Sequence, residues 1–168
     1  MRQVVSKSIV LFTIILPPAA NIAAQPKYTC PRPISMEQKY AKDPRLALLK
    51  KFFMEKECPV SNLSVEFLVA SDTNGLDWRL LPGIAFIEST GGKAYHNNNI
   101  FGWANGDILF PTIQAGIHVV GEELASSHFY KGKSLDQKLS TYNRFPFYGQ
   151  RVKMVMAQIG PQNLASLN

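Results

Sequence analysis

The chain has 168 residues, a formal net charge of +6, and 46% hydrophobic residues, which fits one domain with a packed core. Its two cysteines and three scattered histidines form no zinc pattern, and nothing else suggests a metal or cofactor. No Lys/Arg cluster or known reader motif indicates nucleic acid as a partner.

The first 24 residues have the pattern of a secretory signal peptide. Arg2 and Lys7 precede an apolar run over 9–16, and small residues follow up to Ala24, where we expect cleavage. The mature protein would then be secreted or periplasmic, associated with the cell wall, and mildly basic. An uncleaved N-terminal anchor is the alternative, and no second segment is apolar enough to cross a membrane.

Residues 25–42 contain prolines and lack periodicity, so we expect an extended arm. Cys30 and Cys58 suit an oxidising compartment, where a disulfide would fasten this arm to the end of the first helix. Such a bridge stabilises by about 3–4 kcal/mol in the chain-entropy model. Two free thiols are the alternative.

The rest of the chain, 43–160, predicts one mainly α domain followed by a loose tail, 161–168. Asp43-Pro44 has the composition of a helix start, and Ser134 with Gln137 matches a capping box. Apolar periodicity predicts helices from Asp43 to before Cys58, over 63–70, 77–89, from Phe110-Pro111-Thr112 onward, from 135, and over 148–159.

The stretch 77–106 organises the domain. We expect Asp77 to cap a helix that ends at the glycines after Ser89, which places Glu88 in its last turn. Burial and the helix dipole both disfavour a charge there and raise the pKa of Glu88, as a general acid near neutral pH requires. A carboxylate turned out to solvent is the alternative.

The segment after Gly92 has no helical period, and we expect an irregular loop or a small hairpin lobe. It combines consecutive asparagines with aromatic residues and little charge. Such loops are more often binding surfaces than spacers. Amides match the hydroxyl and acetamido groups of sugars, and aromatic faces match pyranose rings.

Three short motifs in order resemble peptidoglycan-cleaving enzymes. Glu88-Ser89 resembles the Glu-Ser pair of lytic transglycosylases, and Thr141-Tyr142-Asn143 resembles their Ala-Tyr-Asn motif. Asn99 to Trp103 is similar to the Asn-x-Phe-Gly segment of bacterial glucosaminidases. The resemblance implies a lysozyme-like helical fold with Glu88 as the catalytic acid. The chain departs from the transglycosylases in lacking their Gly-Leu-Met-Gln segment and in having Thr141 for Ala.

The resemblance also suggests roles for other residues. Tyr142 would reach Glu88 or the sugar. From its place at the end of the Asn-rich loop, and not from the resemblance, Asp107 is the best candidate for a second carboxylate, with a solvated loop residue as the alternative. The substrate-binding candidates are Ser89, Tyr95, Asn98, Asn99, Phe101, Gly102, Trp103 and Asn143. Structural alternatives remain open, namely core packing for Tyr142 and Phe101 and a backbone hydrogen bond for Ser89.

These observations predict a monomeric glycosidase that acts on the β-1,4 glycan of peptidoglycan. It would be either an N-acetylglucosaminidase-type hydrolase or a lytic transglycosylase, since a single acid suffices when the sugar's own hydroxyl or acetamido group assists. A non-catalytic wall-binding module, a chitin-directed hydrolase and a helical interaction protein are the alternatives.

Overall fold

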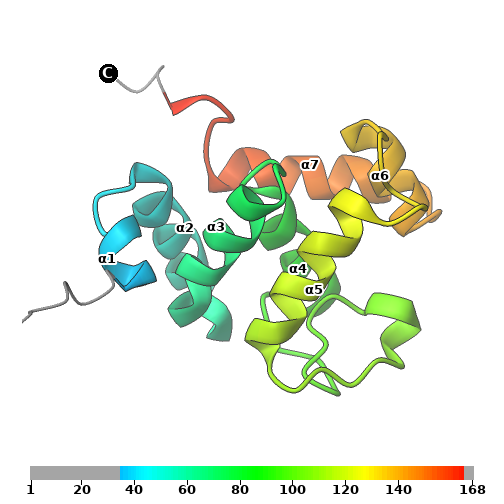
Figure 1. The fold of residues 1–168 in the computed structure, drawn as a ribbon, viewed down its shortest axis with the longest axis horizontal. Coiled ribbons are helices and arrows are strands. Elements are labelled where there is room, and N and C mark those ends of the chain that lie inside the picture. The colour runs from blue at the N-terminus through cyan, green and yellow to red at the C-terminus, as the bar shows by residue number, and fades with distance from the viewer. Residues whose placement is uncertain (1–34, 165–168) are drawn as a thin grey trace, which may run out of the picture. The chain divides into compact units, whose positions relative to one another are not determined.

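The computed structural model describes residues 35–164, and this part of the chain is mainly helical with no strand (Figure 1). Seven α-helices and two short 3₁₀ turns follow one another, in the order α1 Met36–Tyr40, α2 Pro44–Glu55, η1 Pro59–Leu63, α3 Ser64–Thr73, α4 Leu80–Ser89, η2 Trp103–Gly106, α5 Ile113–Ser126, α6 Leu135–Tyr142 and α7 Tyr148–Ile159. The mainly α prediction is confirmed.

Local sequence signals account for several helix starts. The side chain of Asp43 accepts a hydrogen bond from the amide of Arg45 at the start of α2, and Thr112 caps α5 in the same way. Ser134 and Gln137 form the complete capping box before α6. These caps satisfy amides that have no partner inside the helix, and they fix where each helix begins.

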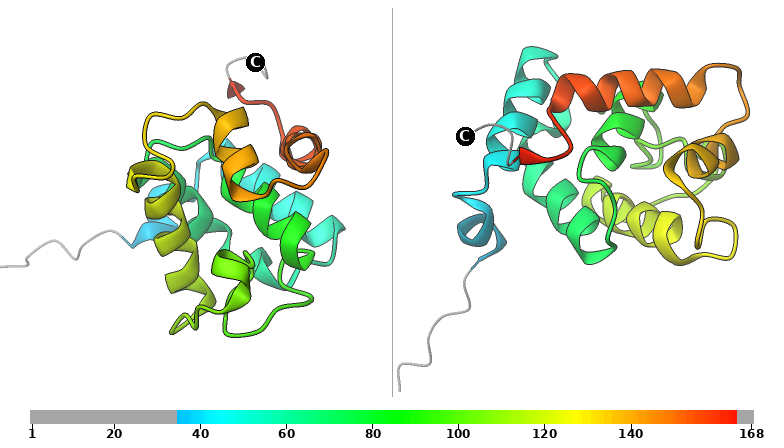
Figure 2. Two further views of the ribbon diagram at one scale, coloured as in Figure 1. Left: turned by 90° about the vertical axis from the view of Figure 1, so that its right-hand side faces the viewer. Right: turned by 90° about the horizontal axis from the view of Figure 1, so that it is seen from above.

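Helix α4 lies in the middle of the described residues and packs along α7 (Figures 1 and 2). The contact is close at Gly83, where an added methyl group would lie 3.1 Å from Cγ of Met156 and 3.4 Å from Cγ1 of Val152. Its Pro82 is the third helical residue, where a missing amide breaks no helical hydrogen bond. Helix α4 begins at Leu80, with Arg79 at the N-cap position, so the predicted start at Asp77 is wrong. The carboxylate of Asp77 accepts from the amide of Arg79 and pairs with its guanidinium, and it thereby caps the turn that precedes α4.

On the other side of the core, α3 packs against α5. Gly121 of α5 faces Leu81 and Asn74, which would both lie 3.3 Å from an added Cβ. The interior glycine therefore lets these helices approach closely. The centre is aromatic and aliphatic. Phe53, Phe67 and Phe101 are fully buried and in ring contact, with centroids 5.5 Å and 6.4 Å apart in sequence order.

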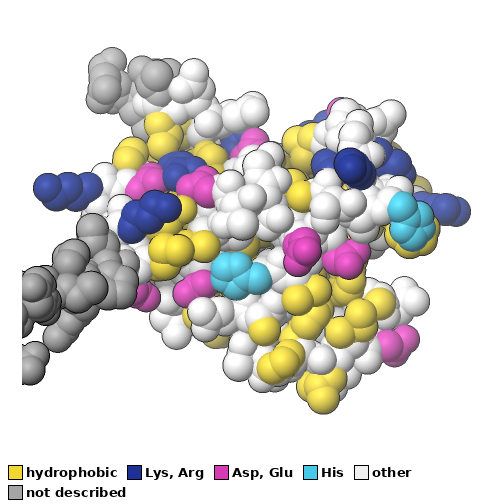
Figure 3. Space-filling view, in the orientation of Figure 1, with side chains coloured by type: hydrophobic (Ala, Val, Ile, Leu, Met, Phe, Trp, Pro, Cys, Tyr) yellow, Lys and Arg dark blue, Asp and Glu magenta, His cyan; other side chains and the backbone are white. Residues whose placement is uncertain are grey.

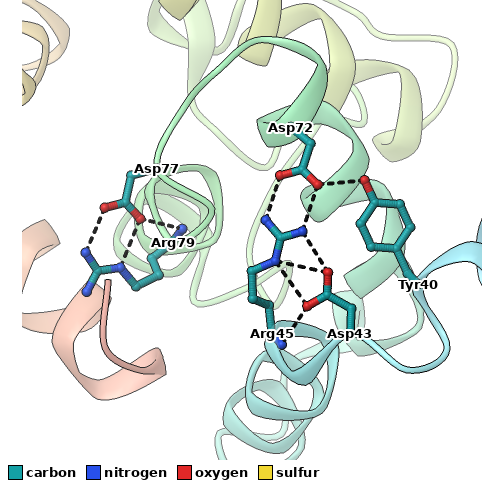
Figure 4. A network of polar contacts seen from close by, with 6 residues as sticks. All are labelled: Tyr40, Asp43, Arg45, Asp72, Asp77 and Arg79. Carbon is teal, nitrogen blue, oxygen red and sulfur yellow. Dashed lines mark hydrogen bonds and ion pairs between the residues drawn. The ribbon is translucent and has the colours of Figure 1, made fainter. Parts of the chain in front are cut away.

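The extended-arm prediction is wrong for Met36–Tyr40, which form α1 behind a capping box at Ser35. A polar network holds this helix to α2 and α3 (Figure 4). The hydroxyl of Tyr40 donates to Asp72 at 2.8 Å, and Arg45 bridges Asp72 and Asp43. A helix of five residues is too short to be stable alone, so these contacts maintain it.

Several predictions fall on residues that the structure does not describe. They are the signal peptide over 1–24, most of the arm with Cys30, and the last four residues of the tail. Cys58 is buried and has no disulfide partner within 35–164, where it is the only cysteine. Its sulfur lies close against Gly91, and burial raises the pKa of its thiol. Within 35–164, no helix combines the length and apolar character that crossing a membrane would require.

Candidate functional site

A cleft of about 950 Å³ opens at the C-terminal end of α4. Glu88 of α4 lies in its wall, and the loop after α4 contributes Gly102 and Trp103. Helix α5 adds Glu123, and the chain around α6 adds a third side. The lining residues from that side are Phe129, Tyr130, Thr141, Tyr142, Asn143 and Arg144. The motifs that are far apart in the sequence thus meet around one space.

Glu88 is half-buried in the last turn of α4, which ends when Thr90 adopts a left-handed conformation with φ 53°. One carboxylate oxygen, Oε1, accepts a hydrogen bond of 2.7 Å from the hydroxyl of Tyr148 at the start of α7. Burial raises the pKa of Glu88, while the Tyr148 hydrogen bond and the charge of Arg151 oppose that rise. The prediction of a raised pKa agrees with this balance.

Gly102 closes the other side of the carboxylate. It has φ 58°, a conformation that L-residues rarely adopt, and a Cβ there would lie 3.2 Å from Oε2 of Glu88. A side chain at position 102 would therefore press on the carboxylate. The glycine of the Asn-Ile-Phe-Gly segment leaves room for Glu88 beside the backbone.

Three tyrosines and one tryptophan form an aromatic wall. Tyr142 stacks on Tyr148 with ring centroids 5.9 Å apart, and Trp103 lies 5.5 Å from Tyr142 and 5.9 Å from Tyr130. Burial, as the largest cause, raises the pKa of all three phenols, so each hydroxyl stays protonated and can donate. The hydroxyls of Tyr148 and Tyr142 donate to Glu88 and to the carbonyl of Phe101, so what these two residues add to the wall is mainly ring surface.

Tyr142 does not donate to Glu88. Its hydroxyl donates to the carbonyl of Phe101 at 2.5 Å, so its hydrogen bond fixes the loop and leaves Tyr148 to bind the carboxylate. Of the two predicted roles for Tyr142, the hydrogen bond to Glu88 is therefore not formed. Its ring lines the cleft, where contact with a sugar stays a prediction.

The asparagines build the loop. Asn99 is buried, donates to the carbonyls of Trp103 and Ile108 and accepts from the amide of Trp103, so both ends of its amide are used. Asn98 donates to the carbonyls of Phe110 and Pro111. Neither lines the cleft. Their amides satisfy the backbone of an irregular segment, as buried polar groups require.

Four other candidates lie apart from the cleft. Ser89 is buried and bonds to the carbonyl of Ala85 and the amide of Gly92, the structural alternative for this residue. Phe101 is fully buried in the core. Tyr95 and Asp107 are exposed and do not line the cleft. By contrast, Gly102, Trp103, Tyr142 and Asn143 join Glu88 there.

Several residues of the site were not among the candidates from the sequence, including Phe129, Tyr130 and Arg144 of the cleft lining. Tyr148 binds Glu88 from a helix start 60 residues away, and the apolar period of α7 gave no sign of this pairing. Glu123 lines the cleft from α5, where its sequence neighbour Glu122 is exposed. Two consecutive glutamates in a helix point in different directions, and only the helix phase against the core distinguishes them.

The described residues contain no group of three side chains suited to hold a metal ion. Comparisons of the chain with protein-family models, with curated proteins and with solved structures found no match. What the cleft can do therefore follows from its own side chains. It presents a carboxyl group with a raised pKa, a second carboxylate and an aromatic wall, a set suited to proton transfer to a ligand that stacks on rings.

Proposed function

We propose that the protein is a secreted or periplasmic glycosidase with a lysozyme-like fold that cleaves the β-1,4 glycan of peptidoglycan. The observation that supports it most is the setting of Glu88. A carboxyl group at a helix end, with its pKa raised by burial, lies in the wall of an open cleft beside Trp103. General acids of glycosidases need this combination of a retained proton and access to a sugar.

In the proposed reaction, protonated Glu88 gives its proton to the glycosidic oxygen as the bond from that oxygen to the anomeric carbon breaks. The resulting Glu88 carboxylate then takes a proton from the incoming nucleophile, which restores the starting state. That nucleophile is water in a hydrolase, or a hydroxyl of the same sugar in a transglycosylase. Tyr148 holds Oε1, so that the carboxyl group keeps one orientation through both steps.

Glu123 replaces Asp107 as the proposed second carboxylate. It lines the same cleft as Glu88, and its negative charge contributes to the raised pKa of Tyr130. A carboxylate there would stabilise positive charge that develops at the anomeric carbon. Asp107, exposed and outside the cleft lining, has no such access.

The test compares Glu88→Gln with wild type on purified peptidoglycan sacculi, with the released fragments identified by mass spectrometry. We expect the rate to fall about 10²–10⁴-fold, the usual contribution of a general acid. Glu122→Gln, on the exposed side of α5, is the matched control and should keep the wild-type rate. Fragments with reducing ends would indicate a hydrolase, and anhydro ends a transglycosylase.

An unchanged rate in Glu88→Gln would refute the assignment of the acid. Wild-type protein that binds sacculi and releases no fragment would instead be a wall-binding module.

A further inference from the structure

Charge is divided unequally along the described residues. Residues 35–126 contain 8 basic and 11 acidic side chains, whereas 127–154 contain 6 basic side chains and only one acidic residue, Asp136. The second segment runs from the end of α5 through α6 into α7. Figure 3 shows Lys and Arg side chains gathered where α6 lies. This basic segment also supplies the third side of the cleft.

One of these cations lines the cleft, and a second is bonded to a lining residue; we refer to the two as the rim cations. Arg144 lines it directly and is exposed. Lys133 donates to the hydroxyl of Thr141 at 2.7 Å, and Thr141 is itself a lining residue. Lys133 precedes α6 and Arg144 follows it, so the chain around α6 brings one cation to the cleft lining and the other to a residue of that lining.

Neither cation is neutralised. Within residues 35–164, Arg144 and Lys133 form no ion pair, and the only hydrogen bond of the Lys133 amine is to a neutral hydroxyl. Two other cations of the segment are occupied. Lys153 pairs with Asp136 at 2.7 Å, and Lys138 donates to the backbone carbonyls of Leu124 and Tyr130. The charge at the rim is thus available to a ligand.

We infer that Arg144 and Lys133 form a subsite for carboxylate groups carried by the glycan, namely those of the peptide substituents of peptidoglycan. A guanidinium matches a carboxylate with two parallel hydrogen bonds, and an ammonium adds a second point of attraction. This inference rests on the proposed function and narrows it, because the subsite favours an acidic glycan over neutral chitin.

The test uses the full chain with Glu88→Gln, so that the ligand is not consumed. Calorimetry would compare soluble peptidoglycan fragments with the same fragments after their carboxylates are converted to neutral amides. We expect amidation to weaken binding about 3- to 10-fold, the effect of one or two exposed ion pairs. Added salt should reduce this difference, because exposed charges are screened.

Variants in the same background assign the effect to residues. With Arg144→Gln and Lys133→Gln together, the native fragments should bind no better than the amidated ones. Arg144→Gln alone changes an exposed side chain that forms no hydrogen bond within residues 35–164, and should lose part of the discrimination without affecting folding. Lys50 is an exposed cation of α2 that does not line the cleft, so Lys50→Gln removes one positive charge elsewhere. This control variant should still bind native fragments more tightly than amidated ones.

Equal affinity for native and amidated fragments would overturn the inference. The inference would also be overturned if the double variant still bound native fragments more tightly than amidated ones. It would be overturned as well if Lys50→Gln lost this preference to the same extent. If the protein binds the glycan in these experiments, none of these outcomes contradicts the proposed function. A protein that binds neither fragment nor neutral chito-oligosaccharides would remove both.

Discussion

Replacing Gly102 by alanine tests whether the position of the Glu88 carboxylate matters. The alanine must adopt φ 58°, which costs about 1–2 kcal/mol for an L-residue. Its methyl group would lie 3.2 Å from Oε2 of Glu88, closer than ordinary van der Waals contact. The carboxylate must then shift by a few tenths of an ångström, which changes the geometry of its hydrogen bond with Tyr148.

Gly75 provides the matched control. Its φ of 60° is nearly the same, and nothing lies within 4 Å of an added Cβ. Gly75→Ala should therefore lose the same 1–2 kcal/mol of unfolding free energy with no effect on the cleft. Urea unfolding measures the loss of unfolding free energy in both variants. Release of fragments from sacculi measures the effect on the cleft.

We expect Gly102→Ala to lower the rate of fragment release about tenfold. A misplacement of 1 Å can cost about 10²-fold, and the shift required here is smaller. Gly75→Ala should keep the wild-type rate per folded molecule. Equal rates in the two variants, with equal loss of stability, would refute the claim that Gly102 positions the acid.

Three further predictions concern stability. Burial raises the pKa of Glu88 in the folded protein above its ordinary value of 4.5, so the ionised carboxylate opposes folding at high pH. Glu88→Gln should therefore be more stable than wild type at pH 8, and this gain should vanish as the pH falls toward 4.5. Urea unfolding that shows no gain at pH 8 would contradict the burial argument. The hydrogen bonds from Arg45 are the largest cause that lowers the pKa of Asp72 below its ordinary value of 3.8. Asp72→Asn should therefore lower the free energy of unfolding by about 1–2 kcal/mol at neutral pH, and by progressively less as the pH falls below 3.8. A loss that does not depend on pH would show that packing, and not the charge of Asp72, is responsible. Phe67→Ala should cost about 3–5 kcal/mol in the same assay, because the ring is fully buried between Phe53 and Phe101, and a loss below 1 kcal/mol would mean that the core closes over the space.

The helices were largely predictable because their signals are local. The capping box at Ser134 and the apolar period over 148–159 depend on residues within one or two turns, and both predictions match α6 and α7. Asp77 shows the limit. Its carboxylate binds the amide and guanidinium of Arg79, as a cap would, but the turn that it closes precedes α4, which begins at Leu80.

The site was predictable only in part, for physical reasons. The position of Glu88 at a helix end follows from glycines close by in the sequence. Its partner Tyr148 depends on how closely α4 and α7 approach at Gly83, a property of the packed core. The prediction that Asn99 binds the substrate was wrong for a different reason. An amide that suits a sugar hydroxyl suits a loop carbonyl equally well, and the needs of the irregular backbone were met first.

The bond between Tyr148 and Glu88 joins residues 60 positions apart, on helices that pack directly against each other. A growing chain acquires Tyr148 late, after nearly all of the domain has been made. Until α7 docks, Glu88 lacks the hydrogen bond that fixes its Oε1. Burial is what raises the pKa of Glu88, whereas Tyr148 and Arg151 of α7 both lower it, so docking of α7 serves the proposed reaction by orienting the carboxyl group.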